Sequence, residues 1–229
     1  NITEVVSNMT ARFCDGFDLY PASIIMDRYD VVTGSFTNGT GRGGTNSLHL
    51  SDWESSITKV FDDKTRWIVG CGYKVSWPST NQKLITFYLD TFPFSHIQMY
   101  ITLDSDGSLK AYRGNGTLLG SSAAGVLIEN TYRYVEFNVL FDTTTANGTI
   151  EVHVAGASVL SLTGVWNTQF GTTVANTITL FGGSSEVGSV DIDDLIIMDS
   201  DGAVNNTFIG NKHVETRLPN AIGINSEWK

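Results

Sequence analysis

The aspartate-rich segment 187–202 is the stretch whose residue types are best suited to chemistry. It is typical of one long strand, in which side chains alternate between two faces. The alternation places Val190, Ile192, Ile196 and Met198 on one face, and Asp191, Asp193, Leu195, Ile197 and Asp199 on the other. Asp194 falls on the apolar face, where an unpaired carboxylate is costly. It therefore marks a β-bulge, a hydrogen-bonded carboxylate or a cation ligand, and all three stay open.

The histidines and cysteines give no sign of a nucleophilic or zinc-binding site. The four histidines are His49, His96, His153 and His213. They lie in separate strands or in the C-terminal segment, and none accompanies a serine or cysteine nucleophile turn. No His/Cys spacing suits zinc. Cys14 and Cys71 each lie in an apolar run, so we expect two buried free thiols, with a disulfide as the alternative. We predict no catalytic residues.

Short alternating segments separated by turn residues position these side chains. The clearest is 66–76, where one apolar face contains Trp67, Val69, Cys71, Tyr73 and Val75. In 96–103, apolar residues alternate with polar ones, and 104–107 is typical of a hairpin turn. About a dozen such strands recur at spacings of about 8–12 residues, and no helical period appears. The sequence therefore predicts an all-β, antiparallel two-sheet sandwich.

Composition excludes several classes of partner. The formal net charge is −10 and no Lys/Arg cluster could neutralise phosphates, so we expect no nucleic acid partner. No run of about 18 apolar residues occurs, so we expect no membrane partner, and no signal-peptide pattern opens the sequence. We assign residues 1–200 to one sandwich. Residues 201–229 alternate poorly, and we expect an extended C-terminal arm on the sandwich or on a neighbouring subunit.

A series of motifs gives the sequence a family resemblance. They are RFCDGF at 12–17, GRGGTNSLHL at 41–50, RWIVGCGYKV at 66–75, DSDGSLKAYRG at 104–114, YRYVEF at 132–137 and VDIDDL at 190–195. Together they resemble concanavalin A-like (laminin G-like) jelly-roll domains. The segment from IDDL to VETRLPN resembles virion-associated proteins of tailed bacteriophages. The resemblance implies a jelly-roll sandwich that decorates or stabilises the capsid, or forms part of a tail fibre.

The same resemblance raises the question of catalysis, because concanavalin A-like folds include glycoside hydrolases. Retaining members resemble a Glu-x-Asp-x-Glu strand, which carries two close carboxylates as nucleophile and acid/base. In this chain no Glu is followed by Asp two positions later. We therefore expect a protein that is not an enzyme.

Calcium is the one cofactor that the resemblance implies, since related sandwiches often hold it between the last strand and the N-terminal region. The matching side chains are Asp15, Asp18, Asp193 and Asp194. Calcium takes about six to eight oxygen ligands, and the nearby loops could add carbonyl groups. The alternative is that Asp194 pairs with Arg12 or Arg133, and that the N-terminal aspartates serve turns.

Aromatic residues in turn-like contexts are the candidates for partner contact. They are Trp53, Trp77, Phe92, Phe94 and Trp166, and the arm adds Phe208, Val214, Leu218 and Trp228. Exposed aromatics serve protein interfaces as well as glycan sites. The expected partners are major capsid or tail proteins and further copies of the chain, with the virion as the location. The alternative is a carbohydrate-binding module that recognises a host-surface glycan.

Overall fold

The computed structural model describes residues 11–18, 21–52, 54–76, 80–90, 96–183, 188–202 and 207–214. Within them the chain forms fifteen β-strands and one short 3₁₀ helix. The first elements are β1 (Ala11–Asp15), η1 (Ala22–Asp27), β2 (Val31–Thr33), β3 (Phe36–Thr40), β4 (Asn46–Leu50), β5 (Ser56–Lys64), β6 (Arg66–Val75) and β7 (Gln82–Tyr88). The others are β8 (Ile97–Leu103), β9 (Leu109–Arg113), β10 (Leu118–Ser121), β11 (Arg133–Leu140), β12 (Thr149–Val154), β13 (Ala157–Thr163), β14 (Ala175–Phe181) and β15 (Val190–Asp199).

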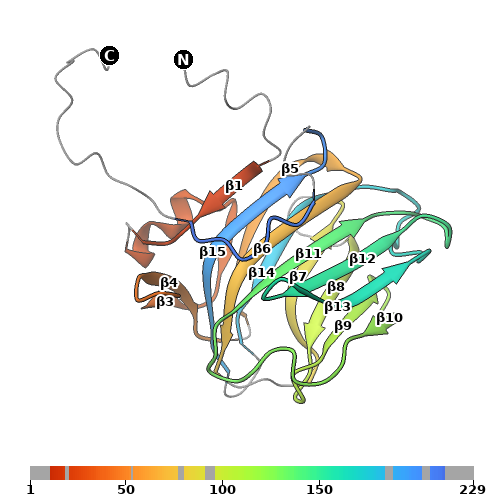
Figure 1. Cartoon of the computed structure of the whole chain (residues 1–229). Coiled ribbons are helices and arrows are strands. Elements are labelled where there is room, and N and C mark those ends of the chain that lie inside the picture. The colour runs from red at the N-terminus through yellow and green to blue at the C-terminus, as the bar shows by residue number, and fades with distance from the viewer. Residues whose placement is uncertain are drawn as a thin grey trace, which may run out of the picture.

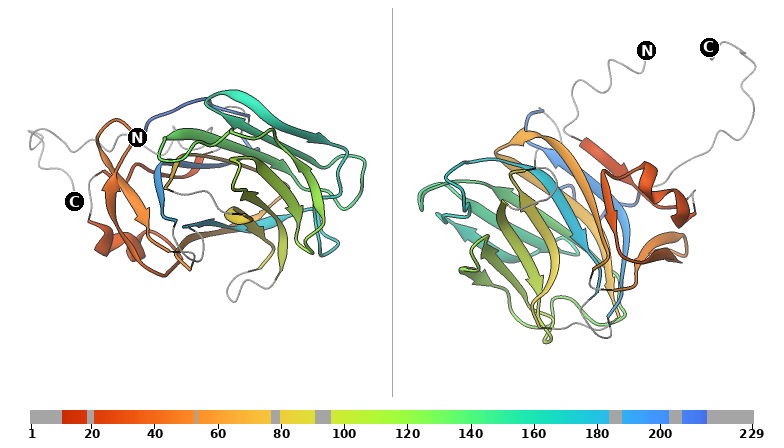
Figure 2. Two further views of the ribbon diagram at one scale, coloured as in Figure 1. Left: turned by 90° about the horizontal axis from the view of Figure 1, so that it is seen from below. Right: turned by 180° about the vertical axis from the view of Figure 1, so that it is seen from behind.

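The strands form two antiparallel sheets that enclose the core between them (Figure 1; Figure 2). The eight-stranded sheet has the order β13-β12-β11-β6-β15-β4-β3, and β1 pairs with β15. The seven-stranded sheet has the order β10-β9-β8-β7-β14-β5-β2. Neighbours far apart in sequence, such as β6 and β15, give the crossed connections of a jelly roll. The predicted all-β sandwich is confirmed.

The predicted alternation of β6 is confirmed by its place in the core. Its five apolar side chains, from Trp67 to Val75, are all buried between the sheets. The indole nitrogen of Trp67 donates a hydrogen bond to the carbonyl of Ala175 at 2.8 Å, so its one polar group is satisfied. β-branched and aromatic residues pack well on such pleated surfaces, which explains why this run forms the central strand.

The faces predicted for β15 are right before Asp194 and wrong after it. The pairing of β15 with β6 shifts register between Asp193 and Ile196, and Asp194 has φ +51°. This bulge interchanges the faces of the residues that follow. Leu195 and Ile197 therefore join Val190 and Ile192 in the core, whereas Ile196 and Met198 lie on the outer face.

Residues 207–214 cross the outer face of the eight-stranded sheet, in front of β6 and β15 (Figure 1). Ile209 and Val214 pack against the outward-facing apolar cluster of Ile68, Ile196 and Met198. This part of the chain thus lies along its own sandwich. Residues 203–206 and 215–229 of the predicted arm, with Leu218 and Trp228, lie outside the described residues, and the boundary at residue 200 stays a prediction.

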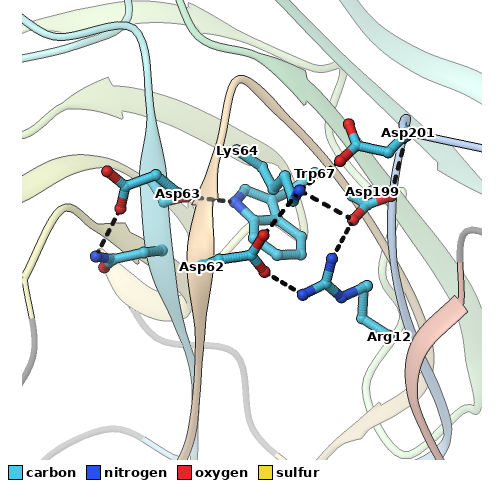
Figure 3. A network of polar contacts seen from close by, with 9 residues as sticks. Arg12, Asp62, Asp63, Lys64, Trp67, Asp199 and Asp201 are labelled. Atoms are coloured by element: carbon cyan, nitrogen blue, oxygen red, sulfur yellow. Dashed lines mark hydrogen bonds and ion pairs between the residues drawn. The ribbon is translucent and has the colours of Figure 1, made fainter.

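An ion-pair network joins β1, β5 and β15 at one edge of the sandwich (Figure 3). Arg12 lies 2.7 Å from the carboxylate of Asp199 and also pairs with Asp62. Lys64 lies 2.8 Å from Asp62, and its hydrogen bond lowers the pKa of that carboxyl. Arg12 therefore pairs with Asp62 and Asp199, not with Asp194 as one alternative expected.

Both cysteines are free, but only Cys71 is buried. The prediction of two buried thiols is wrong for Cys14, whose strand β1 lies at the edge of the sheet and leaves that side chain exposed. Burial raises the pKa of the Cys71 thiol. Within the part of the chain that the structure describes, no helix has the length and apolar character needed to cross a membrane.

Candidate functional site

Asp194, the residue that breaks the sequence pattern, is a fully buried carboxylate with several partners. Arg42 approaches one oxygen with Nε at 2.8 Å and a terminal nitrogen at 2.6 Å. The other oxygen accepts the backbone N–H of Val214 at 2.7 Å and lies 2.7 Å from Nδ1 of His213. Asp194 is thus both a bulge residue and a hydrogen-bonded carboxylate, and its arginine partner is Arg42, not Arg133.

Arg42 ties the glycine-rich loop after β3 to the segment that crosses the sheet. Its guanidinium also bonds the side chain of Asn211 and the carbonyl of Lys212, and its Cζ lies 4.9 Å from the ring centroid of Tyr134. Arg42, Asn211 and Lys212 line an open hollow of about 450 Å³ with Gly43, Thr45 and His213. Because β4 pairs with β15, the fold brings Arg42 to Asp194 despite their distance in sequence.

The four predicted calcium ligands do not act as one group. Asp15 accepts the N–H of Phe17 at 3.0 Å and pairs with Arg28 at 3.0 Å, while Asp194 is held by Arg42. Asp193 accepts the N–H groups of Arg42 and Asp194, and burial, with the charges of Asp194 and Asp18, raises its pKa to about 7. Oδ1 of Asp18 is buried and has no hydrogen-bond partner among the described residues.

The pair of Asp18 and Asp193 therefore fits a hard cation better than the full set of four. Calcium prefers carboxylate and carbonyl oxygens, and an orphaned buried carboxylate oxygen is the kind of donor that it would satisfy. Among the described residues, no three His, Cys, Asp or Glu side chains form a metal-binding group, so loop carbonyls would have to complete the ligand set. Calcium stays a prediction, narrowed to these two carboxylates.

A second candidate site is the outer face of the seven-stranded sheet. One row of directly paired residues crosses all its strands: Val31, Thr58, Thr179, Thr86, Tyr100, Tyr112 and Leu118. The threonines are buried in the floor of this face, and the tyrosine rings stack with centroids 5.1 Å apart and an interplanar angle of 13°. We call Lys83, Tyr100, Tyr112 and Phe181 the aromatic platform.

Lys83 is the cation of the aromatic platform. Its Nζ lies 5.2 Å from the ring centroid of Tyr100 and 5.8 Å from that of Phe181. Lys110, nearby on the same face, pairs with Asp104, whereas no carboxylate pairs with Lys83 among the described residues. Burial lowers the pKa of Lys83. The platform thus combines aromatic rings, hydroxyl groups and one lysine without a carboxylate partner among the described residues. Such groups recognise sugars and sugar acids.

The predicted contact residues lie in different places. Trp166 is 39% exposed, and Cζ of Arg113 lies 4.4 Å from its ring centroid. Phe208 stacks on His153 with centroids 3.7 Å apart, and Val214 packs on the outer face of the eight-stranded sheet. The other aromatic candidates lie outside the described residues, namely Trp53, Trp77, Phe92 and Phe94.

The histidines do not converge on one site in the described structure. Each lies near a carboxylate: His49 by Asp191, His96 by Asp90, His153 by Glu151 and His213 by Asp194. The sequence did not single out the aromatic platform, although the alternation of Gln98, Tyr100 and Thr102 was visible. A polar face looks the same in sequence whether it is open surface or a binding face.

Comparisons with known proteins bear on the fold. No protein-family model matches the sequence, and no curated protein matches it. Endo-β-1,4-glucuronan lyase from the fungus Trichoderma reesei is similar in structure, with 12% identity, TM-score 0.59, and coverage of 82% of this chain and 95% of the lyase. Alginate lyase Aly36B has 15% identity and TM-score 0.51, with 84% and 95% covered.

A third similar structure is a domain with a bound sugar. Domain 4 of AbnA, an extracellular GH43 arabinanase from Geobacillus stearothermophilus solved with arabinotriose, has 17% identity and TM-score 0.51, with 73% and 76% of the chains covered. At these identities the likeness establishes the fold: a jelly-roll β-sandwich that carbohydrate-active and carbohydrate-binding proteins share. These neighbours lend no support to the predicted virion role.

The prediction that the chain is not an enzyme is contradicted by these neighbours. It rested on the missing Glu-x-Asp-x-Glu strand, which concerns glycoside hydrolases alone. The similar structures include two polysaccharide lyases. An elimination needs a base for a carbon-bound proton and an acid for the leaving oxygen, which different side chains can supply. The absence of that strand therefore does not argue against catalysis.

Proposed function

We propose that this chain binds a polysaccharide across the outer face of the seven-stranded sheet. The observation that carries the proposal is the row of paired residues in which buried threonines lead into the stacked Tyr100 and Tyr112. Four interstrand spacings separate Thr58 from Tyr112, about 19 Å in all. That length suits an extended chain of several sugar residues.

The chemistry of the row matches that of a sugar chain. Aromatic rings offer flat apolar surfaces to the C–H faces of sugar rings, and they are already ordered by packing, so little entropy is lost on binding. The hydroxyls of the partly exposed Tyr100 and Tyr112, and the amine of Lys83, can form hydrogen bonds with sugar hydroxyls.

The test is binding of a panel of plant, algal and bacterial polysaccharides, followed by calorimetry with oligosaccharides of the best one. Tyr112→Ala should weaken binding about tenfold. Tyr132→Ala is the matched control, because Tyr132 is a half-buried tyrosine that bonds the carbonyl of Thr40 beside the eight-stranded sheet. Equal affinities for the wild type and Tyr112→Ala would refute binding at the platform.

A second function, eliminative cleavage of an acidic polysaccharide, is favoured by Lys83. Burial lowers the pKa of its amine, and Tyr100 lies beside it. In such an elimination the neutral amine of Lys83 would take the proton on the carbon next to the carboxylate. A carbon–carbon double bond forms as the glycosidic C–O bond breaks, and a tyrosine hydroxyl protonates the leaving oxygen.

Cleavage is tested by the ultraviolet absorbance of the unsaturated product on polyuronates. We expect wild-type protein to produce it and Lys83→Gln to lose it while still binding substrate. Full activity in Lys83→Gln would exclude Lys83 as the base. Absence of product from every polyuronate that the wild type binds would leave the binding function and exclude the cleavage.

A virion structural role, with capsid or tail proteins as partners, remains a proposal that rests on the resemblance of 192–220 to virion-associated proteins. Particles lacking the protein, incubated with an excess of it, would show ordered density on heads or tails if the role is right. Particles without added density would exclude it. A place on the virion would be compatible with a glycan-binding platform on the outer face of the seven-stranded sheet.

A further inference from the structure

The connection between β13 and β14 is held in place by two buried amide side chains. Gln98, fully buried on β8, accepts the N–H groups of Gln169 at 2.9 Å and Phe170 at 3.3 Å. Its amide nitrogen donates to Thr172 and to the carbonyl of Val174 at 2.9 Å. Every hydrogen-bonding atom of the Gln98 side chain is therefore used to hold this connection.

Asn167 anchors the other end of the connection in the same way. It is fully buried, accepts the N–H of Asp142 at 2.9 Å and donates to the carbonyl of Leu140 at 2.8 Å. Two satisfied buried amides on either side make residues 166–170 a well-positioned loop. Its conformation is fixed before any ligand arrives.

The loop presents large apolar side chains to solvent. Trp166 is 39% exposed and Phe170 is 42% exposed, and His96 packs edge-on against Phe170 with centroids 4.5 Å apart. Rigid aromatic side chains bind with little loss of conformational entropy, which is why they recur in binding sites. Packing alone does not explain why two buried amides hold two aromatic residues in solvent.

Arg113, at the end of β9, supplies a charge at this loop. Its Nε donates to the carbonyl of Trp166 at 2.9 Å, and its guanidinium lies over the indole ring at 4.4 Å. These contacts fix the plane of the guanidinium, and among the described residues no hydrogen bond engages its two terminal nitrogens, so they can donate to a ligand. Arg113 has no carboxylate partner among the described residues, although the chain carries a formal net charge of −10.

We infer that Arg113, Trp166 and Phe170 form a subsite for an acidic sugar residue. An oriented guanidinium binds a carboxylate through two parallel hydrogen bonds, and the neighbouring aromatic surfaces contact the sugar ring. Gln98 precedes Tyr100 by two residues on the same face of β8, so the loop borders the aromatic platform. The subsite rests on the proposed function and gives it a substrate class, uronate-containing polysaccharides.

The experiment compares two probes that differ in charge alone: a β-1,4-linked glucuronate oligosaccharide and the same oligosaccharide after reduction of its carboxylates. Affinities for both are measured by calorimetry with the wild type, Arg113→Gln and Arg113→Lys. The wild type should prefer the acidic probe by about tenfold. Arg113→Gln should lose most of this preference and keep only the part that the charge of Lys83 supplies. Arg113→Lys should regain only part of what is lost, since an ammonium group cannot form the paired bonds.

Two controls separate this subsite from the platform. Tyr112→Ala should weaken the binding of both probes to a similar extent. Arg133→Gln, at an arginine of β11 that forms no ion pair with the residues that the structure describes, should change the affinity for neither probe. A wild type that binds both probes equally, or an Arg113→Gln variant that keeps the preference, overturns the acidic subsite and leaves the platform intact. A wild type that binds neither these nor any other glycan overturns the platform as well.

Discussion

At the scale of single residues, Arg42 supplies the positive charge beside Asp194, a role that we had considered for a bound cation. Its guanidinium meets the buried Asp194 and also holds Asn211 and the carbonyl of Lys212. An arginine suits this position, because its planar fork can bond several acceptors at fixed angles. Arg42 thus attaches residues 211 and 212 of the segment that crosses the sheet to the buried carboxylate of β15.

We expect Arg42→Gln to lower the free energy of unfolding by about 3–5 kcal/mol, because it leaves Asp194 as a buried charge without its main partner. Urea unfolding followed by tryptophan fluorescence measures this loss. Arg133→Gln, which removes an arginine that forms no ion pair in the described structure, should cost less than about 1 kcal/mol. Equal losses in the two variants would contradict the role of Arg42.

Calcium should stabilise the fold through Asp18 and Asp193. Neither carboxylate has an ion-pair partner among the described residues, which favours a bound cation. Calcium at about one hundred times its dissociation constant would add about 2.7 kcal/mol. Thermal unfolding in calcium and in chelator checks this. Asp193→Asn should abolish the difference, whereas Asp27→Asn, at an exposed aspartate of η1, should keep it. Identical melting temperatures in calcium and chelator would exclude the site.

Lys83 gives the proposed cleavage a defined pH dependence. The base must be the neutral amine, and burial shifts its pKa below the usual 10.5. Cleavage should therefore rise as pH increases through that lowered pKa, while the affinity for an acidic glycan falls as the positive charge is lost. Lys83→Arg should bind at all these pH values and not cleave. A cleavage rate that is flat with pH would contradict this assignment.

At the scale of elements, the alternation of apolar residues predicts the faces of a strand as long as no β-bulge interrupts the strand. The alternation in 66–76 and 96–103 predicted the inner faces of β6 and β8 correctly. In β15 the extra residue at Asp194 reversed the pattern, and alternation alone could not show where the pairing shifts. The partner of Asp194 was missed for another reason: Arg42 lies 152 positions away, and its proximity follows from sheet order.

The segment 207–214 is held to β11 by Glu136, a carboxylate that is 1% exposed. One oxygen accepts the N–H groups of Ile209 at 2.9 Å and Gly210 at 3.1 Å. Glu136→Ala should raise amide hydrogen exchange at 209–210 and cost about 1–3 kcal/mol. Glu129→Ala, at an exposed glutamate of the loop before β11, should leave that exchange unchanged. Unchanged exchange in both variants would show that Glu136 does not hold the segment.

At the scale of the whole molecule, the outer faces of the two sheets have different roles. The outer face of the eight-stranded sheet is occupied by the chain itself, through residues 207–214. The outer face of the seven-stranded sheet carries paired threonines, stacked tyrosines and Lys83, which has no carboxylate partner in the part of the chain that the structure describes. The fold class could be predicted from the sequence because many strands repeat one alternating pattern. The platform could not be predicted, because it depends on the order in which the strands of the seven-stranded sheet lie side by side.

The most direct test of glycan binding at the seven-stranded sheet is a residue-resolved map of the binding site by NMR. Isotope-labelled protein is titrated with oligosaccharides of the best-bound polysaccharide, and amide shifts are followed on both sheets. We expect shifts concentrated around Lys83, Tyr100 and Tyr112, with β11 and β12 unaffected. Shifts concentrated on β11, β12 and the segment 207–214, or the absence of shifts with every glycan, would contradict it.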